Sequence, residues 1–584
     1  MRRKTNTLQS FVPSSSLKRG WDSLRSSAPL LRIVSFLDRI GWAKVATVLT
    51  SSLLVALILI RMYYSIVTGY LLPDESYYYS QYILNHAPLT SYRPFFHVVF
   101  LLFFQGTGSI SQLFVRGAIF SSIWAVGTTL ALYKILREIG TFDKHSSLVL
   151  LSLPLFPIFS VMAVFFVTET LGIFLAFLGI LFSIRYLKRS KLVDVALAAI
   201  FFVLAYQTRE PYLLLALGNF LVLLFLKPKL RGLAIYALIA LIVVPVPISI
   251  YPVSFTQPVT NFLFVNLPSY LASLQHPVVQ NSSVISTATI GHTSVISTAT
   301  IGHTSTSVTS TSTLVQNTVA PTTITLSLNL NDLSGFFLGL VYGFGPLFAI
   351  FTVLSLAVVA GKKDPLSIAI LLIMLLALGT FLIASDSEIS LLPSGIGPWL
   401  SDIVRLADSA VLVLVGFGYF YAKFKPKYLL ALLLVYLVIG LALVPQLGGV
   451  LQASQNPSGQ AVNRLSLDYR APYFRMYQIA STSGNVLIIG GLSLRGIRVY
   501  ASMLPNVNLT AIPPTQQDFN SLLNHNWSAI FLYDDYYTIA SPNLISAYPA
   551  YYQQVVLSHS YGNYVIKQLW VDGESYALQL VKEG

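Results

Sequence analysis

Eleven apolar runs of about the length of a membrane-spanning helix recur along this chain, and they constrain its fold more than any other feature. Only 10% of the residues are charged, against about 25% in soluble domains, which excludes a soluble globular enzyme. The sequence therefore predicts a polytopic α-helical membrane protein with about 11 transmembrane helices. The runs cover residues 46–66, 112–133, 146–164, 167–184, 192–206, 211–226, 232–250, 334–357, 366–385, 406–422 and 428–446.

The positions of Lys and Arg predict the orientation of these runs. Basic clusters fall between alternate pairs of runs, at 134–144, 185–191, 227–231, 362–363 and 423–427. With nine more in residues 1–45, they hold 24 of the 36 Lys and Arg residues. Basic loops are retained on the cytoplasmic side, so residues 1–45 are expected to be a basic cytoplasmic tail. The C-terminus is then extracytoplasmic.

The apolar segment Pro94–Phe104 is too short to be counted as a membrane-spanning helix. About eleven helical residues cannot cross a hydrocarbon core of roughly 30 Å. If the segment did cross, every later basic cluster would move to the outer side. We therefore expect a juxtamembrane or re-entrant helix within a first outer loop, residues 67–111, of a transmembrane domain that spans 46–449.

Two further segments are predicted to lie outside the membrane. Residues 251–332 form a Ser/Thr-rich external loop in which the 11-residue unit SVISTATIGHT occurs twice, at 283–304. Residues 450–584 are polar. Their pattern of apolar residues and turns predicts a small extracytoplasmic α/β domain. Its expected strands are 485–491, 507–512, 528–533, 564–571 and 575–581, with a helix at 517–525.

Glycosylation sequons and the absence of cysteine add two minor constraints. The Asn-x-Ser/Thr sequons at Asn281, Asn508 and Asn526 all fall on the predicted outer side, as glycosylation requires. A chain without cysteine has no disulfides, thiolate metal sites or cysteine nucleophiles.

Asp74 and Glu75 follow the first apolar run, in LLPDESYYYSQYIL. Ionisable groups at or near membrane depth are energetically expensive and usually serve a site or a partner. A carboxylate pair at the outer end of a span can act as a general base or hold a cation. The alternative is structural, with Asp74 capping a helix that starts at Glu75.

Three more charged positions fall on the same predicted side. Glu169 lies in a tight outer turn, and Arg209 lies in the next one, where a local ion pair with Glu210 is the alternative interpretation. Arg405 precedes the tenth run and can bind a lipid phosphate through paired hydrogen bonds, or simply extend to the interface. Carboxylates and arginines beside an apolar surface suit a substrate that joins a phosphate to a long hydrocarbon.

The order of these motifs resembles that of the fold-C (GT-C) glycosyltransferases, in the branch that holds protein O-mannosyltransferases and lipid A aminoarabinose transferases. The resemblance covers about residues 45–425. Three departures are a single proline where the family has two, Leu406 in place of a tyrosine, and Arg209 where the family has lysine. The motifs that carry it are Asp74-Glu75, Tyr92-Arg93-Pro94, Phe114-Val115-Arg116, Thr168-Glu169, Thr208-Arg209 and Val404-Arg405.

The resemblance implies an inverting transfer of a sugar from a polyprenyl- or dolichyl-phosphate donor to a hydroxyl of a protein, lipid or glycan acceptor. Asp74 would be the general base, and Glu75 and Glu169 would bind sugar or acceptor hydroxyls. In some members a divalent cation, Mg²⁺ or Mn²⁺, would bind at Asp74 and Glu169. The charge on the leaving phosphate would be neutralised by Arg405, Arg93 and Arg209. The residues Tyr78, His97 and Arg116 would bind the acceptor or the sugar.

Two other classes remain open at this point. A transporter or flippase of a lipid-linked glycan would also need a charged outer surface, but a transport path needs polar groups inside the spans. A cell-surface protein would use the external loop and the C-terminal domain as its functional parts. The spans would then serve only as a membrane anchor, and eleven are excessive for that purpose. Nucleic acid is excluded as a partner because the basic residues follow the cytoplasmic loops. The composition is compatible with a prokaryotic plasma membrane, an archaeal one included, and an endoplasmic reticulum location gives the same topology.

Overall fold

The computed structural model describes residues 39–87, 93–243, 352–389, 411–424 and 470–583, with short gaps inside these ranges. The gaps are residues 142, 156, 210–211, 228, 354, 358–359, 362–363, 491–494, 535–547, 559 and 572–575. Most of the predicted basic tail, the Ser/Thr-rich loop and the run at 428–446 lie outside the described residues. The predicted site residue Arg405, the alternative ion-pair partner Glu210 and the sequon at Asn281 also lie outside them.

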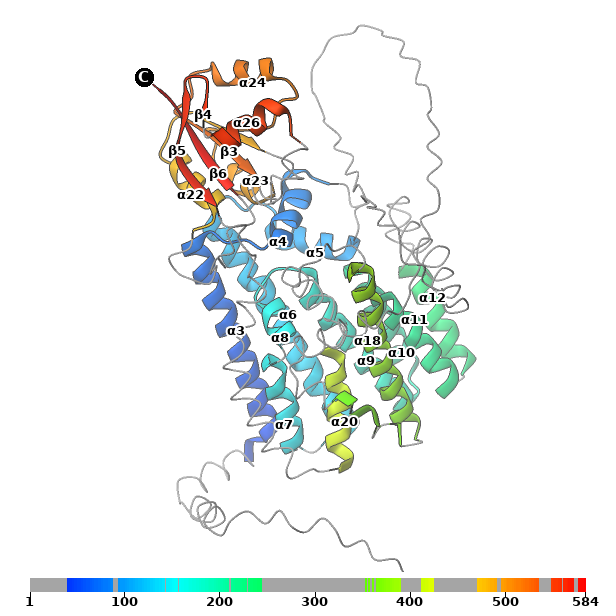
Figure 1. Cartoon of the computed structure of the whole chain (residues 1–584). Helices are drawn as coiled ribbons and strands as arrows, with labels where there is room; N and C mark the ends of the chain where they lie inside the picture. The colour runs from blue at the N-terminus through cyan, green and yellow to red at the C-terminus, as the bar shows by residue number, and fades with distance from the viewer. Residues whose placement is uncertain are drawn as a thin grey trace, which may run out of the picture. The chain divides into compact units, whose positions relative to one another are not determined.

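Three helices in the described part of the chain are long and apolar enough to cross a membrane: α3 (Trp42–Thr68), α6 (Ile110–Ile139) and α9 (Thr168–Arg189). Helix α3 packs against α6, and α6 packs against α9 (Figure 1). Helices α3 and α6 contain the predicted runs 46–66 and 112–133, and α9 contains all but the first residue of the run 167–184. The chain therefore has helices compatible with a membrane protein.

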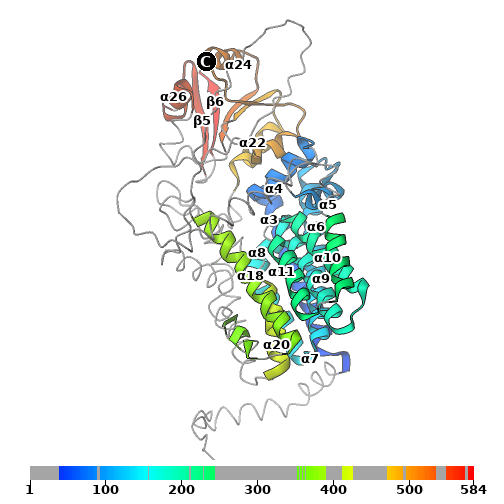
Figure 2. The same cartoon turned by 90° about the vertical axis from the view of Figure 1, so that its right-hand side faces the viewer.

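Five further apolar helices complete the described bundle. Helix α10 packs along α9, and Gly179 permits the close approach, since a Cβ there would lie 2.9 Å from the Phe202 ring. Helix α11 packs along α18 (Figure 2). The bounds of the five are α10 (Leu192–Thr208), α11 (Tyr212–Leu226), α12 (Leu230–Val243), α18 (Pro365–Ile389) and α20 (Leu414–Phe424).

One predicted span, residues 146–164, is wrong as a single continuous helix. The structure has α7 (Asp143–Ser152), a 3₁₀ turn η2 (Leu153–Leu155) and α8 (Pro157–Ala163) in its place. Pro154 and Pro157 explain the interruption, because proline has no N–H to donate and its ring disturbs the preceding turn. Hydropathy alone counts this segment as one run, since proline scarcely lowers its apolar average.

The segment between α3 and α6, for which the sequence predicts an outer loop, has three short helical elements among its described residues: α4 (Pro73–Tyr78), the π-helical η1 (Tyr79–Leu84) and α5 (Pro94–Phe104). The bounds of α5 are those predicted from the sequence. Pro94 is its first residue, a position where the missing N–H costs nothing. Its rings at Phe96, Phe100 and Phe104 are fully buried. The segment is therefore an independent short helix held by aromatic packing.

The C-terminal domain is built on a six-stranded mixed sheet of strand order β2-β1-β3-β6-β5-β4. Strand β1 pairs in parallel with β2 and β3, and β6 pairs antiparallel with β3 and β5. All five longer strands fall at their predicted places. The strands are β1 (Val486–Gly490), β2 (Val507–Ala511), β3 (Ala529–Asp534), β4 (Ser560–Tyr561), β5 (Tyr564–Val571) and β6 (Tyr576–Lys582).

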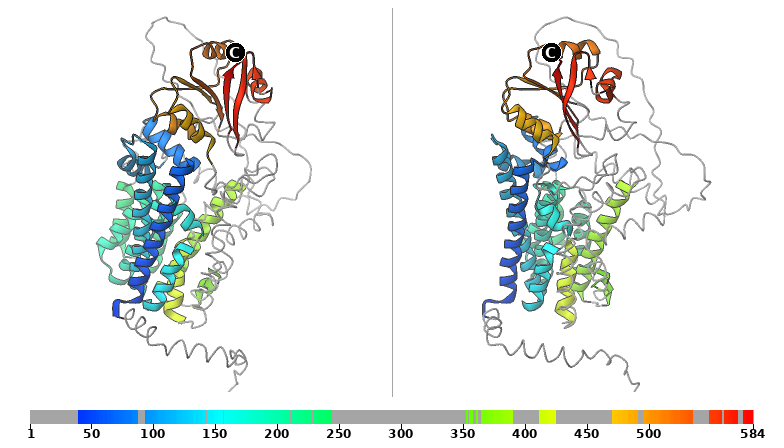
Figure 3. Two further views of the ribbon diagram at one scale, coloured as in Figure 1. Left: turned by 90° about the vertical axis from the view of Figure 1, so that its left-hand side faces the viewer. Right: turned by 60° about the vertical axis from the view of Figure 1, so that its left-hand side comes forward.

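Helices cover both faces of this sheet (Figure 3). On one face, α24 (Gln516–Leu523) and α26 (Ala550–Ser558) pack over Leu487, Ile489 and Leu532. On the other, α22 (Pro472–Ala480) brings Tyr473 against Tyr533, with 6.5 Å between ring centroids. Every residue of β1 and β3 is buried, as expected for central strands covered on both faces. Helix α23 (Arg495–Ala501) contacts β2 and α22.

Candidate active site

The carboxylate pair lies in α4, directly after the end of α3. Helix α3 ends at Gly69, which has a φ of +70° in the left-handed region, and the chain then turns into α4 at Pro73. Glu75 accepts a hydrogen bond from the Leu72 N–H at 2.9 Å, so Glu75 caps the new helix from its third position. Asp74 lies inside the first turn and is partly exposed. The alternative in which Asp74 caps a helix starting at Glu75 is therefore wrong.

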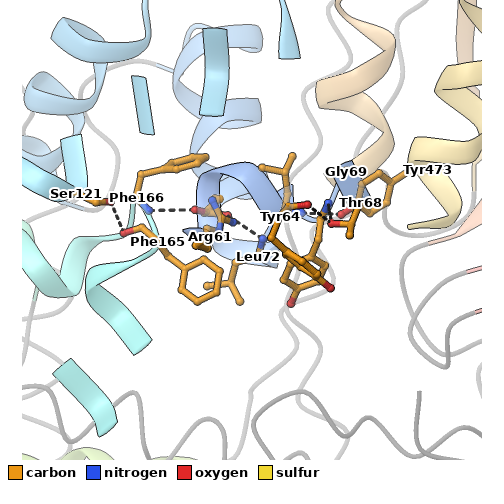
Figure 4. Close-up of polar contacts among 12 residues, drawn as sticks. Arg61, Tyr64, Thr68, Gly69, Leu72, Ser121, Phe165, Phe166 and Tyr473 are labelled. Carbon is orange, nitrogen blue, oxygen red and sulfur yellow. Dashed lines mark hydrogen bonds and ion pairs between the residues drawn. The ribbon is translucent and has the colours of Figure 1, made fainter. Parts of the chain in front are cut away.

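The Glu75 side chain is fully buried and has three donors around it. Arg61 of α3 approaches Oε2 at 2.5 Å, and the Phe166 N–H donates to Oε1 at 3.0 Å. Phe166 and Leu72 reach the carboxylate from opposite sides (Figure 4). Burial raises the pKa of Glu75, while the guanidinium and the two backbone N–H groups act in the opposite direction. Glu75 thus connects α3, α4 and the segment that leads into α9.

Arg61 is one of the few charged residues that the sequence places near the outer membrane face, but the sequence assigns it no specific role. Its guanidinium lies over the Phe165 ring at 4.6 Å and near Phe114 at 5.6 Å. Cation–π contacts of this kind compensate part of the cost of removing a guanidinium from water. The sequence does indicate that Arg61 has a partner, because a guanidinium within a 27-residue apolar helix is energetically expensive without one. The sequence did not show that the partner is Glu75.

Glu169 and Arg209, predicted separately, form a buried ion pair. Glu169 is in the first turn of α9, and Arg209 follows the last residue of α10, with 3.3 Å between Oε1 and Nη1. The Thr168 hydroxyl donates to the other carboxylate oxygen at 3.1 Å. The pair joins the N-terminal end of α9 to the C-terminal end of α10. Since the positive charge of Arg209 is adjacent to Glu169, a cation at Glu169 is electrostatically disfavoured.

Arg93 and Tyr78, also predicted separately, contact each other. The Arg93 guanidinium donates to the Tyr78 hydroxyl and lies 5.9 Å from the centre of its ring. Arg93 has a φ of +81°, an uncommon conformation for a residue other than glycine, at the point where the chain enters α5. The Tyr78 ring packs on Phe96 at 4.8 Å. The geometry therefore gives the guanidinium a defined place beside α4.

His97 and Arg116 take part in packing around α5. The His97 ring stacks on Tyr82 with 3.9 Å between centroids, and burial lowers the pKa of His97 to about 4. Arg116 of α6 donates to the carbonyl oxygens of Phe103 and Gln105, at 3.3 and 2.6 Å. Carbonyls at a helix C-terminus have no partner within the helix, so Arg116 stabilises the end of α5. A direct role in sugar or acceptor binding stays a prediction for both residues.

The C-terminal domain contacts the backbone that precedes Asp74. The Tyr500 hydroxyl donates to the Gly69 carbonyl at 2.6 Å, and the Leu71 N–H donates to the Tyr473 hydroxyl at 2.8 Å. Figure 4 shows Tyr473 beside Gly69. The Phe474 ring occupies the space where a side chain at Gly69 would lie. The pKa of Tyr500 is raised well above its usual value by complete burial. These contacts fix the turn between α3 and α4.

The two sequons within the described residues are on the surface of the C-terminal domain. Asn508 is exposed on the edge strand β2, and Asn526 is exposed in the loop after α24. Both side chains are therefore accessible, as modification requires.

The prediction of a divalent cation gains no support from the described side chains. Among the residues that the structure describes, no group of three or more His, Asp or Glu side chains is arranged to hold a metal ion. Carboxylate oxygens are the ligands that Mg²⁺ prefers, yet Glu169 is already paired with Arg209. Cation binding at Asp74 and Glu169 stays a prediction.

Comparison with known proteins assigns no relative. No protein-family model matches the chain, and no curated protein sequence matches it.

Proposed function

We propose that this chain is a multi-pass membrane glycosyltransferase of the GT-C type. It would move a sugar from a polyprenyl- or dolichyl-phosphate donor to an acceptor hydroxyl of a protein, lipid or glycan. We further propose about eleven spans, a cytoplasmic N-terminus and an extracytoplasmic C-terminal domain, because this orientation places the basic clusters in the cytoplasm.

The observation that carries the proposal is the hydrogen bond from the Phe166 N–H to Glu75. It joins the Asp74-Glu75 motif to the segment that enters α9 at Thr168-Glu169, across 91 positions of sequence. Glu169 in turn contacts Arg209. Two of the motifs that resemble those of the family are thus in direct contact, and the third is linked to them through Phe166, two residues before Thr168. This linkage supports a common site at the outer ends of α3, α9 and α10.

The neighbouring carboxylates Asp74 and Glu75 suit different roles. Glu75 is fully buried in an ion pair, so it orients the loop, whereas Asp74 is partly exposed beside it. A general base must be accessible to the acceptor hydroxyl from which it takes the proton. Asp74 would take that proton as the hydroxyl oxygen attacks the anomeric carbon. The bond from that carbon to the phosphate oxygen breaks with inversion, and the electron pair leaves on the lipid phosphate.

Arginines near the site would stabilise the leaving group. Preorganised positive charge aimed at the oxygen where charge develops is a large contributor to catalysis. Arg93 has a defined position beside α4, and Arg405 is proposed for the same phosphate from the sequence alone. Arg209 would act more weakly, because its charge is partly compensated by Glu169.

A transfer assay on purified protein tests the proposal against the transporter alternative. Short-chain polyprenyl-phosphate sugars would be supplied as donors with hydroxyl acceptors, and release of the lipid phosphate would be followed. Acceptor-dependent release supports a transferase. Donor binding without release, across several sugars and acceptors, would contradict the proposal and favour a carrier of lipid-linked glycans.

A further inference from the structure

A polar cavity lies at the opposite end of α3 from the Asp74 loop. Its lining residues come from the start of α3, the end of α6 and the start of α7. These three helices pack against one another (Figure 1). Its volume is about 510 Å³, within the roughly 300–1,000 Å³ usual for ligand sites. Arg61 and Lys44 are 17 residues apart on α3, or about 25 Å of helix. The cavity is therefore separate from the candidate active site.

The lining of this cavity is strongly basic. It includes the exposed side chains of Arg39, Lys44 and Arg137, and one carboxylate, Asp143. The Asp143 carboxylate accepts a hydrogen bond from the Ala43 N–H at 3.3 Å. Among the described residues it forms no ion pair with any of these three cations. A net positive charge therefore faces the opening at neutral pH.

The surroundings are those of a membrane interface. The uninterrupted apolar part of α3 begins after Lys44, two residues past Trp42, and the Lys144 ammonium lies 5.5 Å from the centre of the Trp42 ring. Tryptophan and basic side chains gather at the headgroup level of bilayers. The Arg137 guanidinium lies over the Tyr133 ring, which also lines the cavity. A ligand here would meet cationic groups together with the apolar side chains of Ile40 and Ala43.

We propose that this cavity binds the phosphate-bearing headgroup of an anionic membrane lipid. Basic pockets between transmembrane helices are the usual setting for such headgroups, and guanidinium groups match phosphate oxygens in paired hydrogen bonds. Arg39 and Arg137 reach the phosphate from two different helix ends, and Lys44 adds charge. The inference does not depend on the proposed transferase activity.

The test is a binding titration on the purified full-length chain in neutral detergent. The probes are dihexanoyl phosphatidylglycerol, which is anionic, dihexanoyl phosphatidylcholine, which is zwitterionic, and inorganic phosphate. The test variant is R39Q/R137Q. The matched control, K134Q/R231Q, removes the same charge from exposed positions that do not line the cavity.

The wild type and the control should bind the phosphatidylglycerol probe with similar affinity, and R39Q/R137Q should bind it roughly tenfold more weakly or worse. Binding of inorganic phosphate with the same dependence on Arg39 and Arg137 would also support the site and assign a free anion as its ligand. Equal weakening in both double variants would show unspecific charge attraction and overturn the proposal. Equal binding of phosphatidylcholine by the wild type would overturn it as well.

Discussion

The Arg61 guanidinium of α3 and the Glu75 carboxylate of α4 form a buried ion pair, with 2.5 Å between Nη2 and Oε2. The contact joins an apolar helix to the loop that carries Asp74, so it fixes where that loop leaves α3. Glu75 is fully buried and Arg61 nearly so. Breaking such a pair from one side leaves the other charge without compensation in a medium of low polarity.

The two single substitutions of this pair should differ in cost. E75Q leaves a guanidinium that cannot lose its proton, and should destabilise the protein by about 3 kcal/mol. R61M leaves a carboxyl whose pKa burial already raises, so it can become neutral and should cost less. The double variant should recover part of the loss. Thermal unfolding of all four proteins in detergent gives the coupling free energy, and equal, additive losses would contradict the account.

Gly69 should tolerate no side chain because the C-terminal domain fills the space beside it. In G69A the new Cβ would lie 2.1 Å from Cγ of Phe474, in addition to a left-handed strain of about 1–2 kcal/mol. Gly106 is the matched control, since its φ of +72° is nearly the same but nothing lies within 4 Å of its Cβ position.

The melting temperature of G69A should therefore fall clearly further than that of G106A. Limited proteolysis should also release the C-terminal domain faster from G69A than from G106A. Similar melting temperatures and similar proteolysis in the two variants would show that the contact with Phe474 is not formed.

His97 should make the fold sensitive to mild acid. Its pKa is lowered to about 4 in the folded protein from an ordinary 6.5, so the unfolded chain binds more protons between these values. The contribution of neutral His97 to the free energy of unfolding is therefore present above pH 6.5 and is lost as the pH falls toward 4. The loss between pH 7 and pH 5 is about 2 kcal/mol.

The pH dependence of thermal unfolding checks this assignment. H97Q should lose less stability than the wild type over the same pH interval. Substitution of the exposed His86 by asparagine, which tolerates its positive φ, should leave the wild-type dependence unchanged. If the melting temperature of H97Q falls with pH as steeply as that of the wild type, the pH dependence comes from a group other than His97.

The sequence predicted the elements better than it predicted their partners. The bounds of α5 and the five longer strands of the C-terminal sheet follow from local patterns of apolar residues, glycine and proline. The interrupted span at Pro154 shows the limit, because a hydropathy average does not register a missing N–H. The pairs Glu169–Arg209 and Arg93–Tyr78 were named residue by residue but not as pairs. Which side chains pair is set by how separate helices and loops pack, which no local pattern encodes. For that reason the sequence did not identify Glu75 as the partner of Arg61.

The most direct test of the central claim is the rate of lipid-phosphate release in the D74N variant. Asparagine keeps the shape of the side chain but cannot take a proton, and loss of a general base lowers the rate by about 10²–10⁴-fold. The same substitution at the exposed Asp518, in the C-terminal domain, controls for effects on folding and insertion. We predict that D74N binds donor normally and loses release by this factor, while D518N keeps it. Wild-type release by folded, membrane-inserted D74N would contradict the assignment of Asp74 as the base.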